Sequence, residues 1–181
     1  MKLELLVSVM NQEAHALADK MNISTDAIIV NQCDRYGYEE FQHRGRTIRF
    51  FSMAERGVGL SRNHALLRAG GEISLFSDED IVYWDGYEEK VLGEFTKHPE
   101  ADMILFNFDV KEDRRTYTNT AWKRVHLYNC GRYPTFSFAI RTEQMHQLNL
   151  TYSLLFGGGA KYSNGEDSLF IRDCIKKGMK V

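Results

Sequence analysis

Two acidic residues at the end of an apolar segment are the first candidates for chemistry in this sequence. Asp78 and Asp80 follow residues 72–76, whose pattern predicts a buried strand. Residues two apart in an extended chain point to the same side, so both carboxylates would face one cavity. Mg²⁺ and Mn²⁺ prefer oxygen ligands and usually take one or two carboxylates, with water and phosphate oxygens completing the octahedron. The pair therefore indicates a divalent-cation site, and a solvated acidic turn is the alternative.

A second acidic pair, Glu166 and Asp167, stands at the start of the last expected helix. Carboxylates in a first helical turn complement the helix dipole and the unpaired N–H groups in proteins of many kinds. One of these two could instead act as a general base that removes a proton from a substrate hydroxyl, provided that the loop 156–165 brings it over the edge of the sheet. Taken alone, the pair does not decide between the two interpretations.

The segment 55–63 combines a glycine turn, the start of a helix and two arginines, Arg56 and Arg62. Backbone N–H groups at a helix N-terminus and a forked guanidinium both favour phosphate oxygens, so a pyrophosphate would suit this segment. It is not a dinucleotide fingerprint, because Arg62 stands in the place of the third glycine. It is not a P-loop either, because the Gly-Lys-Ser/Thr ending is missing.

Alternating strand and helix patterns predict the framework that positions these residues. Strands are expected at residues 3–9, 27–30, 47–51, 72–76, 102–108 and 135–140, and helices at 12–21, 61–69, 88–97 and 166–177. This alternation predicts an α/β fold with a mostly parallel sheet and helices on both faces. Open sheets of this kind bind ligands at the carboxyl ends of their strands, which is where Asp78 and Asp80 are expected.

Length and charge limit the classes of function. A chain of 181 residues with 43% hydrophobic residues supports a single domain over residues 1–181. Residues 179–181 could begin a further edge strand, which suggests a chain truncated at its C-terminal end. The formal net charge of −2 provides no positive field that would collect phosphate backbones, so we expect no nucleic-acid partner.

The chain contains no window with the roughly 20 apolar residues that cross a bilayer, so no transmembrane segment is expected. Its first ten residues lack the features of a signal peptide. Cys33, Cys130 and Cys174 are too scattered for a zinc cluster, and their odd number fits reduced thiols. We therefore expect a cytoplasmic protein, and peripheral association with the inner face of a membrane stays open.

Other chemistries find little support in the sequence. The six histidines show no metal-ligand spacing, and no serine stands in a Gly-x-Ser-x-Gly motif. The aromatic residues between Trp122 and Tyr133 could stack on sugar rings or form a buried cluster, and the sequence leaves both interpretations open.

The order of these motifs resembles that of family 2 glycosyltransferases of the GT-A fold. The resemblance spans most of the chain and is strongest from Arg56 to Asp80, where the glycine turn, the Arg-Asn helix and the acidic strand end occur together. The matching segments are Leu6 to Val9, Ile28 to Val30 followed by Asp34, Gly59 to Asn63, Gly71 to Asp80, and Gly165 to Asp167. Their joint occurrence favours the functional interpretation of both acidic pairs.

The resemblance implies a role for each matching residue. Asp80, assisted by Asp78, would hold Mg²⁺ or Mn²⁺ at the diphosphate of a nucleotide-sugar donor, expected to be a UDP-sugar. Asp167 would be the general base, with Glu166 beside it. The residues implied in donor binding are Val9, Asn31, Asp34, Arg62, Asp78 and Glu79. The sequence departs from the family pattern at Asn31, where an acidic residue is usual, and at Val9 to Asn11, where Pro-x-Tyr-Asn is common.

The reaction implied by the resemblance is a single in-line displacement with inversion at the anomeric carbon. The base would deprotonate an acceptor hydroxyl on a glycan or a lipid-linked glycan, as in polysaccharide biosynthesis, while the metal stabilises the departing nucleoside diphosphate. The alternative is a non-catalytic module of the same fold that binds a nucleotide sugar or a carbohydrate.

Two other enzyme classes fit the sequence less well. A phosphohydrolase of the haloacid-dehalogenase type expects Gly-Thr after its D-x-D motif, where this chain has Ile81 and Val82. A sugar nucleotidylyltransferase needs a glycine-rich loop after its first strand, and residues 11–13 contain no glycine.

Overall fold

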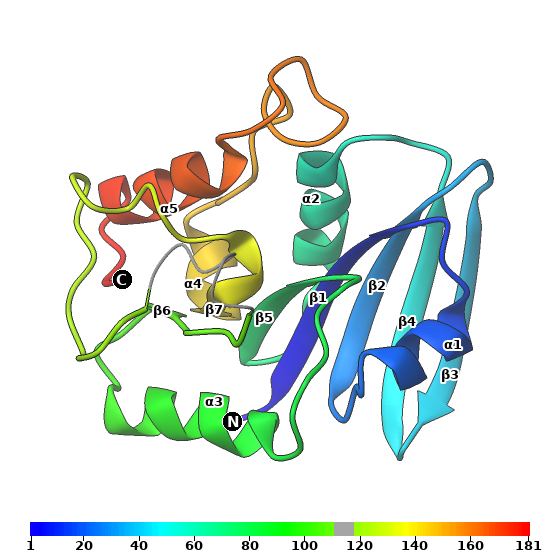
Figure 1. The fold of residues 1–181 in the computed structure, drawn as a ribbon, viewed down its shortest axis with the longest axis horizontal. Coiled ribbons are helices and arrows are strands. Elements are labelled where there is room, and N and C mark those ends of the chain that lie inside the picture. The colour runs from blue at the N-terminus through cyan, green and yellow to red at the C-terminus, as the bar shows by residue number, and fades with distance from the viewer. Residues whose placement is uncertain (111–117) are drawn as a thin grey trace.

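The computed structural model describes residues 1–110 and 118–181. Within these residues, seven strands form one sheet in the order β3-β4-β2-β1-β5-β7-β6 (Figure 1). The strands are β1 Leu3–Met10, β2 Asp26–Gln32, β3 Gly37–His43, β4 Arg46–Met53, β5 Ile73–Asp78, β6 Met103–Leu105 and β7 Phe138–Arg141. The helices are α1 Ala14–Lys20, α2 Val58–Arg68, α3 Tyr87–Lys97, α4 Thr142–Gln147 and α5 Glu166–Lys176, and a short 3-10 helix, η2, covers Thr135–Ser137.

The centre of the sheet is parallel and its margins are antiparallel. Strand β1 pairs in parallel with β2 and β5, and β2 pairs in parallel with β4. The pairs β3–β4, β5–β7 and β6–β7 are antiparallel. The expected α/β architecture with a mostly parallel sheet is confirmed, and the carboxyl ends of β1, β2 and β5 meet at one edge.

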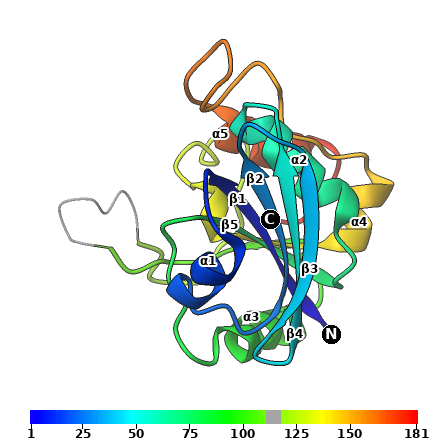
Figure 2. The ribbon, with the colours of Figure 1, turned by 90° about the vertical axis from the view of Figure 1, so that its right-hand side faces the viewer.

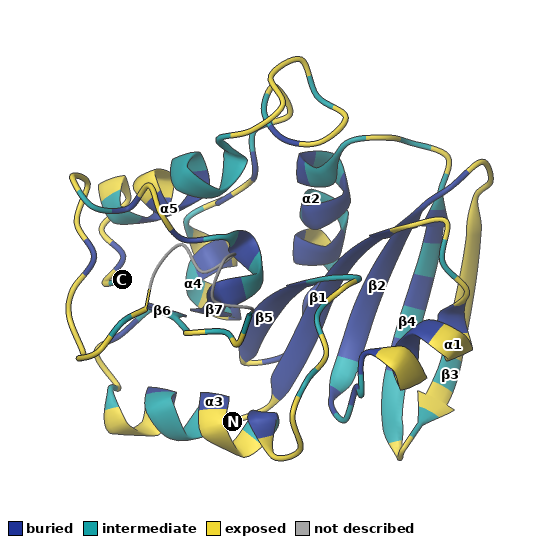
Figure 3. Cartoon of the chain, in the orientation of Figure 1, coloured by how far each residue is buried: buried dark blue, intermediate teal, exposed yellow. Residues whose placement is uncertain are grey.

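Alternating residues of the central strands supply two cores, one on each face. Leu5 of β1 belongs to the core that includes Leu17 of α1 and Phe95 of α3. Leu6 belongs to the opposite core, which includes Phe170 of α5 and residues of α2 and α4. Figure 2 shows α1 and α4 on opposite sides of the sheet, and Figure 3 shows the central strands buried along their length. Because both faces are covered, the middle parts of β1 and β2 are apolar on consecutive residues rather than alternate ones.

Strand β3 and helix α4 are absent from the sequence-based expectation. Strand β3 is an exposed edge strand that pairs with β4 through a turn at Arg44 and Gly45, both with positive φ. Most of its residues are exposed, and Phe41 packs only partly buried against the core that includes α1, so its sequence carries little apolar alternation. Helix α4 spans only six residues, which is too short for a reliable helical period.

Two expected elements have different bounds. The strand expected at 102–108 is limited to β6, and just beyond it Phe106 N–H donates to Ser137 O of η2. The strand expected at 135–140 begins instead with η2, which precedes β7. Among the described residues, no helix has the length and apolar character needed to cross a membrane. The three cysteines are buried and unpaired, as expected for reduced thiols.

Candidate functional site

The buried guanidinium of Arg62 joins the two acidic motifs that lie far apart in the sequence. Its Nη1 lies 2.9 Å from Asp167 Oδ1 and 3.4 Å from Glu166 Oε1, and its Nη2 lies 3.2 Å from Asp78 Oδ1. The arginine side chain is only 5% exposed. Burial raises the pKa of Asp78 against the opposing effect of Arg62, and Asp167 and Asp80 add to the rise. One cation therefore faces three carboxylates, and negative charge is in excess.

Helix α2 can bring Arg62 to this position because the loop before α5 packs on its first turn. The side chain of Asn63 exchanges two hydrogen bonds with the backbone of Tyr152, at 2.9 and 2.7 Å. A Cβ on Gly59 would come within 2.7 Å of Ser153 O, so only glycine permits this approach. Figure 1 shows α2 and α5 at the same end of the sheet, with the loop rising above them.

The N-terminus of α2 is already occupied by protein groups. Gly57 N–H donates to Gln32 Oε1 at 2.8 Å, and Val58 N–H donates to Gly158 O at 2.9 Å. These two N–H groups are therefore not available to a pyrophosphate in this conformation. The phosphate cradle expected from the glycine turn is not formed here, and Arg62 pairs with carboxylates.

The strand that carries the D-x-D motif ends at Asp78, and the chain turns before Asp80. Ile81 N–H donates to Asp78 O at 3.2 Å, so the expected extended geometry with both carboxylates on one side is wrong. Asp78 faces Arg62, while Asp80 is exposed and lines a large cavity. Between them, Glu79 Oε2 accepts a hydrogen bond from Met10 N–H at 2.8 Å. The motif therefore divides its carboxylates among three directions.

The residues expected near the nucleotide lie at the ends of β1 and β2. Val9 and Asn31 are register partners across these strands, and both are buried. Asn31 accepts from Gln12 N–H at 3.0 Å and donates to Gln12 O at 3.2 Å, so both atoms of its amide hold the loop after β1. Asp34 is exposed in the turn after β2. Their roles toward a donor stay predictions.

The acidic residues fit a cation that is held jointly with a substrate. No group of three or more His, Cys, Asp and Glu side chains in residues 1–110 and 118–181 is arranged to hold a metal by itself. Mg²⁺ is commonly bound by one or two carboxylates together with substrate phosphates. The exposed Asp80 fits this mode, whereas Asp78 would share its carboxylate with Arg62.

Two residues at the site escaped the sequence analysis. Thr135 in η2 donates from Oγ1 to Asp167 Oδ1, and the hydroxyl of Tyr152 lies 3.2 Å from the same Oγ1. The guanidinium of Arg62 lies 5.3 Å from the centre of the Tyr152 ring. Thr135 lies in a segment that the sequence presents as a strand, and Tyr152 lies in a loop, so no local pattern marks either residue.

Comparison with known proteins decides the family. The model of the family described as glycosyl transferase family 2 matches residues 3–164. The chain belongs to glycosyl transferase family 2. The match includes the segment from Arg56 to Asp80 and ends before Glu166 and Asp167. The resemblance seen in the sequence is therefore confirmed.

Solved structures show the same fold as this family 2 chain. The crystal structure of S. aureus TarS 1-349 in complex with UDP-GlcNAc has a TM-score of 0.71 and 17% identity, covering 98% of this chain and 54% of that one. The TarS 1-349 complex with UDP has a TM-score of 0.67 and 18% identity, covering 94% and 54%. This chain thus spans about half the length of these TarS chains. No curated protein sequence matches it. The GT-A fold expectation is confirmed.

In this family 2 chain, Asp80 opens onto a cavity of about 970 Å³. The cavity lies between the segment that follows β5, the first turns of α3 and the segment that follows β6. Trp84 contributes to its wall and is 67% exposed. Further aromatic side chains of the wall are Tyr83, Tyr87, Phe106, Phe108 and Phe136, with Lys90 and Asn107 among the polar ones. A mostly apolar wall with a few polar groups is typical of a small-molecule site.

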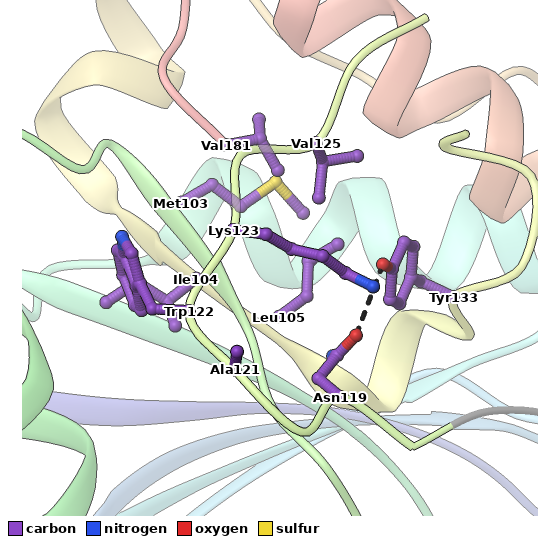
Figure 4. Close-up of a pocket in the computed structure, with 10 residues that line it drawn as sticks. All are labelled: Met103, Ile104, Leu105, Asn119, Ala121, Trp122, Lys123, Val125, Tyr133 and Val181. Atoms are coloured by element: carbon purple, nitrogen blue, oxygen red, sulfur yellow. Dashed lines mark hydrogen bonds between the residues drawn. The ribbon is translucent and has the colours of Figure 1, made fainter. Parts of the chain in front are cut away.

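A second, smaller pocket of about 130 Å³ lies near the aromatic stretch around Trp122. Figure 4 shows Trp122 at one side, Tyr133 and Asn119 at the other, and Val181 beside Met103. Trp122 stacks on His98, with ring centroids 3.5 Å apart, while Tyr133 is buried. The stretch therefore includes both exposed and buried rings.

Proposed function

We propose that this chain forms the donor-binding and catalytic part of a glycosyltransferase that moves a sugar from a nucleoside diphosphate sugar to an acceptor hydroxyl. The observation that carries the proposal is the contact of Arg62 with Asp78 and Asp167 in a chain of glycosyl transferase family 2. This contact joins the two acidic motifs near the carboxyl ends of parallel strands, which is where open α/β sheets bind ligands.

The proposed donor is a UDP-sugar. TarS, which shares the fold, has been crystallised with UDP-GlcNAc and with UDP. In the proposal, Asp80 holds Mg²⁺ or Mn²⁺ together with the donor diphosphate. Asp78 assists Asp80 while its carboxylate remains paired with Arg62. The metal would neutralise charge on the departing diphosphate. The donor contacts of Val9, Asn31, Asp34 and Glu79 are proposed from the family resemblance, and these residues lie at or after the carboxyl ends of β1, β2 and β5.

Asp167 is the better placed of the two candidates for the base. Its Oδ1 accepts from both Arg62 and Thr135, while its Oδ2 has no hydrogen bond in the described part of the chain. Its side chain is 26% exposed, against 14% for Glu166. The Glu166 carboxyl also packs under the backbone of Gly157, where an added Cβ would lie 2.8 Å from Cδ. We propose that Oδ2 accepts the acceptor proton as the hydroxyl oxygen attacks the anomeric carbon, which inverts the configuration.

The acceptor in this proposal is a glycan or a lipid-linked glycan. The cavity beside Asp80 is wide enough for a sugar ring, and the exposed indole of Trp84 offers a flat face for stacking. Polar groups such as Lys90 and Asn107 would hydrogen-bond ring hydroxyls. The reaction would place the protein among the enzymes that build polysaccharides or other glycans.

A donor titration tests the proposal. UDP and GDP are titrated calorimetrically into the full-length protein with and without Mn²⁺, and sugar release from UDP-GlcNAc is then measured. We expect UDP binding that depends on Mn²⁺, together with slow donor hydrolysis. Asp80→Ala should weaken the Mn²⁺-dependent binding by roughly tenfold or more. Glu89→Ala, an exposed carboxylate on α3, is the matched control.

Two outcomes would change the conclusion. Metal-dependent UDP binding without any sugar release would favour the non-catalytic nucleotide-sugar-binding module. Absence of nucleotide binding under all conditions would contradict both functions.

A further inference from the structure

A buried chain of hydroxyl groups ends on the carboxylate of Asp167. Thr135 Oγ1 is hydrogen-bonded to Asp167 Oδ1, and Tyr152 Oη lies 3.2 Å from Thr135 Oγ1. Thr135 is 1% exposed and Tyr152 is 2% exposed, so water does not compete for either hydroxyl. The three residues come from η2, the loop before α5, and α5 itself.

Hydrogen-bond chemistry fixes the direction of this chain. An ionised carboxylate only accepts, so Thr135 must donate its proton to Asp167. The Thr135 oxygen is then left as an acceptor for the hydroxyl of Tyr152. Burial raises the pKa of Tyr152 well above its ordinary value, so this hydroxyl retains the proton that it donates. The chain therefore runs in one direction, from Tyr152 through Thr135 to Asp167.

The far end of the chain is anchored in the core. The ring of Tyr152 stacks on Phe170 with centroids 4.1 Å apart and planes 1° from parallel. It also meets Phe76 of β5 edge to face. Phe170 belongs to α5, the helix that carries Asp167, so Tyr152 is fixed against the same helix that its hydroxyl chain reaches.

The charged groups around Asp167 do not fix its carboxylate alone. Arg62 of α2 approaches Oδ1, and Asp78 of β5 and Glu166 of α5 share that guanidinium. A carboxylate that is bound through one oxygen by one donor can still rotate about its terminal bond, because such torsions are broad. The second donor, Thr135, reaches the same oxygen from another element, and Oδ2 has no hydrogen bond among the described residues.

We propose that Thr135, supported by Tyr152, is a positioning residue that holds Asp167 with Oδ2 directed to the acceptor hydroxyl. This inference rests on the proposed function, in which Asp167 is the general base. Neither residue touches the reacting atoms. Their contribution is to orient the base, and small misplacements of a reacting group can cost on the order of 10²-fold in rate.

Substitution of Thr135 tests the proposal. Thr135→Val keeps the shape of the side chain and removes the hydroxyl that donates to Asp167. The kcat for sugar transfer from UDP-GlcNAc should therefore fall roughly tenfold to 10²-fold. The KM for UDP-GlcNAc should stay within about twofold, because Thr135 is not proposed to contact the nucleotide sugar. Thr135→Ser retains the hydroxyl and should restore most of kcat.

A matched control separates positioning from general destabilisation. Thr142 is another buried threonine, with a hydroxyl partner, Ser74, at 2.8 Å, and both lie away from the carboxylates. Thr142→Val should leave kcat unchanged. The double variant Thr135→Val/Tyr152→Phe removes both hydroxyls together and should fold with a Tm near that of the wild type, while keeping the low kcat.

The outcomes distinguish failure of this inference from failure of the proposed function. Wild-type kcat in folded Thr135→Val, with Asp167→Asn inactive, would overturn the positioning role and leave the proposed function standing. Wild-type turnover in Asp167→Asn would overturn both. A loss of kcat in Thr135→Val that serine does not rescue, or an equal loss in Thr142→Val, would also overturn the positioning role.

Discussion

The carboxylates at the two ends of the central strands differ in how they are paired with cations. At the amino-terminal edge, Glu4 of β1 accepts from Arg49 at 2.8 Å and from the N–H groups of Gly70 and Gly71 at 2.7 and 3.0 Å. Its register partner Asp26 pairs with Lys2 at 2.6 Å and accepts from Thr47 N–H at 2.8 Å. Each of these two acids has its own cation and at least one backbone donor.

At the carboxyl-terminal edge, Asp78, Glu166 and Asp167 share the single cation Arg62, and Asp80 is exposed. The same sheet therefore carries a neutralised edge and an edge with excess negative charge. Acids without their own partners cost stability, and functional sites are where proteins retain such costs. This contrast agrees with the proposal that the carboxyl-terminal edge binds a cation together with the donor, whereas the acids at the amino-terminal edge stabilise the fold.

Asp167→Asn should give the largest effect at the functional edge. Loss of the base should lower turnover by about 10²–10⁴-fold while donor affinity stays within about twofold. Steady-state kinetics and calorimetric titration of UDP measure the two quantities separately. Asp173→Asn, an exposed acid on the same helix, is the control. Equal loss of donor affinity and turnover would contradict the division of roles between Asp167 and Asp80.

Removal of Arg62, which is shared by three acids, should destabilise the protein more than removal of Arg49, which pairs with Glu4. Arg62→Met leaves three carboxylates around an apolar side chain and should cost about 3–5 kcal/mol. Arg49→Met should cost less, about 1–3 kcal/mol, because Glu4 keeps its two backbone donors. Urea unfolding of both variants measures the difference, and equal losses would erase the contrast between the edges.

Asp78→Asn should stabilise the fold. Burial raises the pKa of Asp78 above the ordinary value of 3.8, so folding disfavours its ionised form. At neutral pH the uncharged amide should therefore gain on the order of 0.5–1 kcal/mol. This advantage should disappear as the pH falls through the raised pKa, because the wild-type group is then protonated in the folded state. Thermal unfolding between pH 7 and pH 4 checks the sign, and a loss of stability at pH 7 would refute it.

Asp26→Asn should show the opposite sign with the smallest magnitude. Burial acts to raise the pKa of Asp26, but the hydrogen bonds from Lys2 and Thr47 outweigh it and lower the pKa below 3.8. The ionised group therefore stabilises the fold above pH 4, by at most about 1 kcal/mol. The variant should be less stable at pH 7, and the gap should close as the pH falls through the lowered pKa. A gap that persists at pH 2 would show another cause.

The sequence predicted the parts of the fold that have strong local patterns. The strands and helices from β1 to α3, apart from the exposed β3, follow from apolar periodicity and glycine positions. Helix α5 and its acidic start were also predicted. The short α4 and the end of β6 were not, because α4 has only six residues and the extent of β6 depends on its pairing with β7.

The site could be predicted as a set of residue types but not as a network. The acidic motifs were found because their types and order are distinctive. Thr135 was not found, nor was the contact of Arg62 with three carboxylates. Arg62 and Asp167 are separated by 105 residues, so no local pattern connects them. The expectation that the strand extends to Asp80 was also wrong, because the chain turns after Asp78.

Side-chain hydrogen bonds fasten the loop after β1 to strand β2 and the turn after β5 to the end of β1. Met10 N–H donates to Glu79, and the side-chain amide of Asn31 bonds to both the backbone N–H and the backbone C=O of Gln12. Binding a ligand above these loops therefore needs little additional ordering of the backbone, so less conformational entropy is lost on association. Because these loops are already ordered, more of the interaction energy with a ligand can contribute to discrimination between ligands.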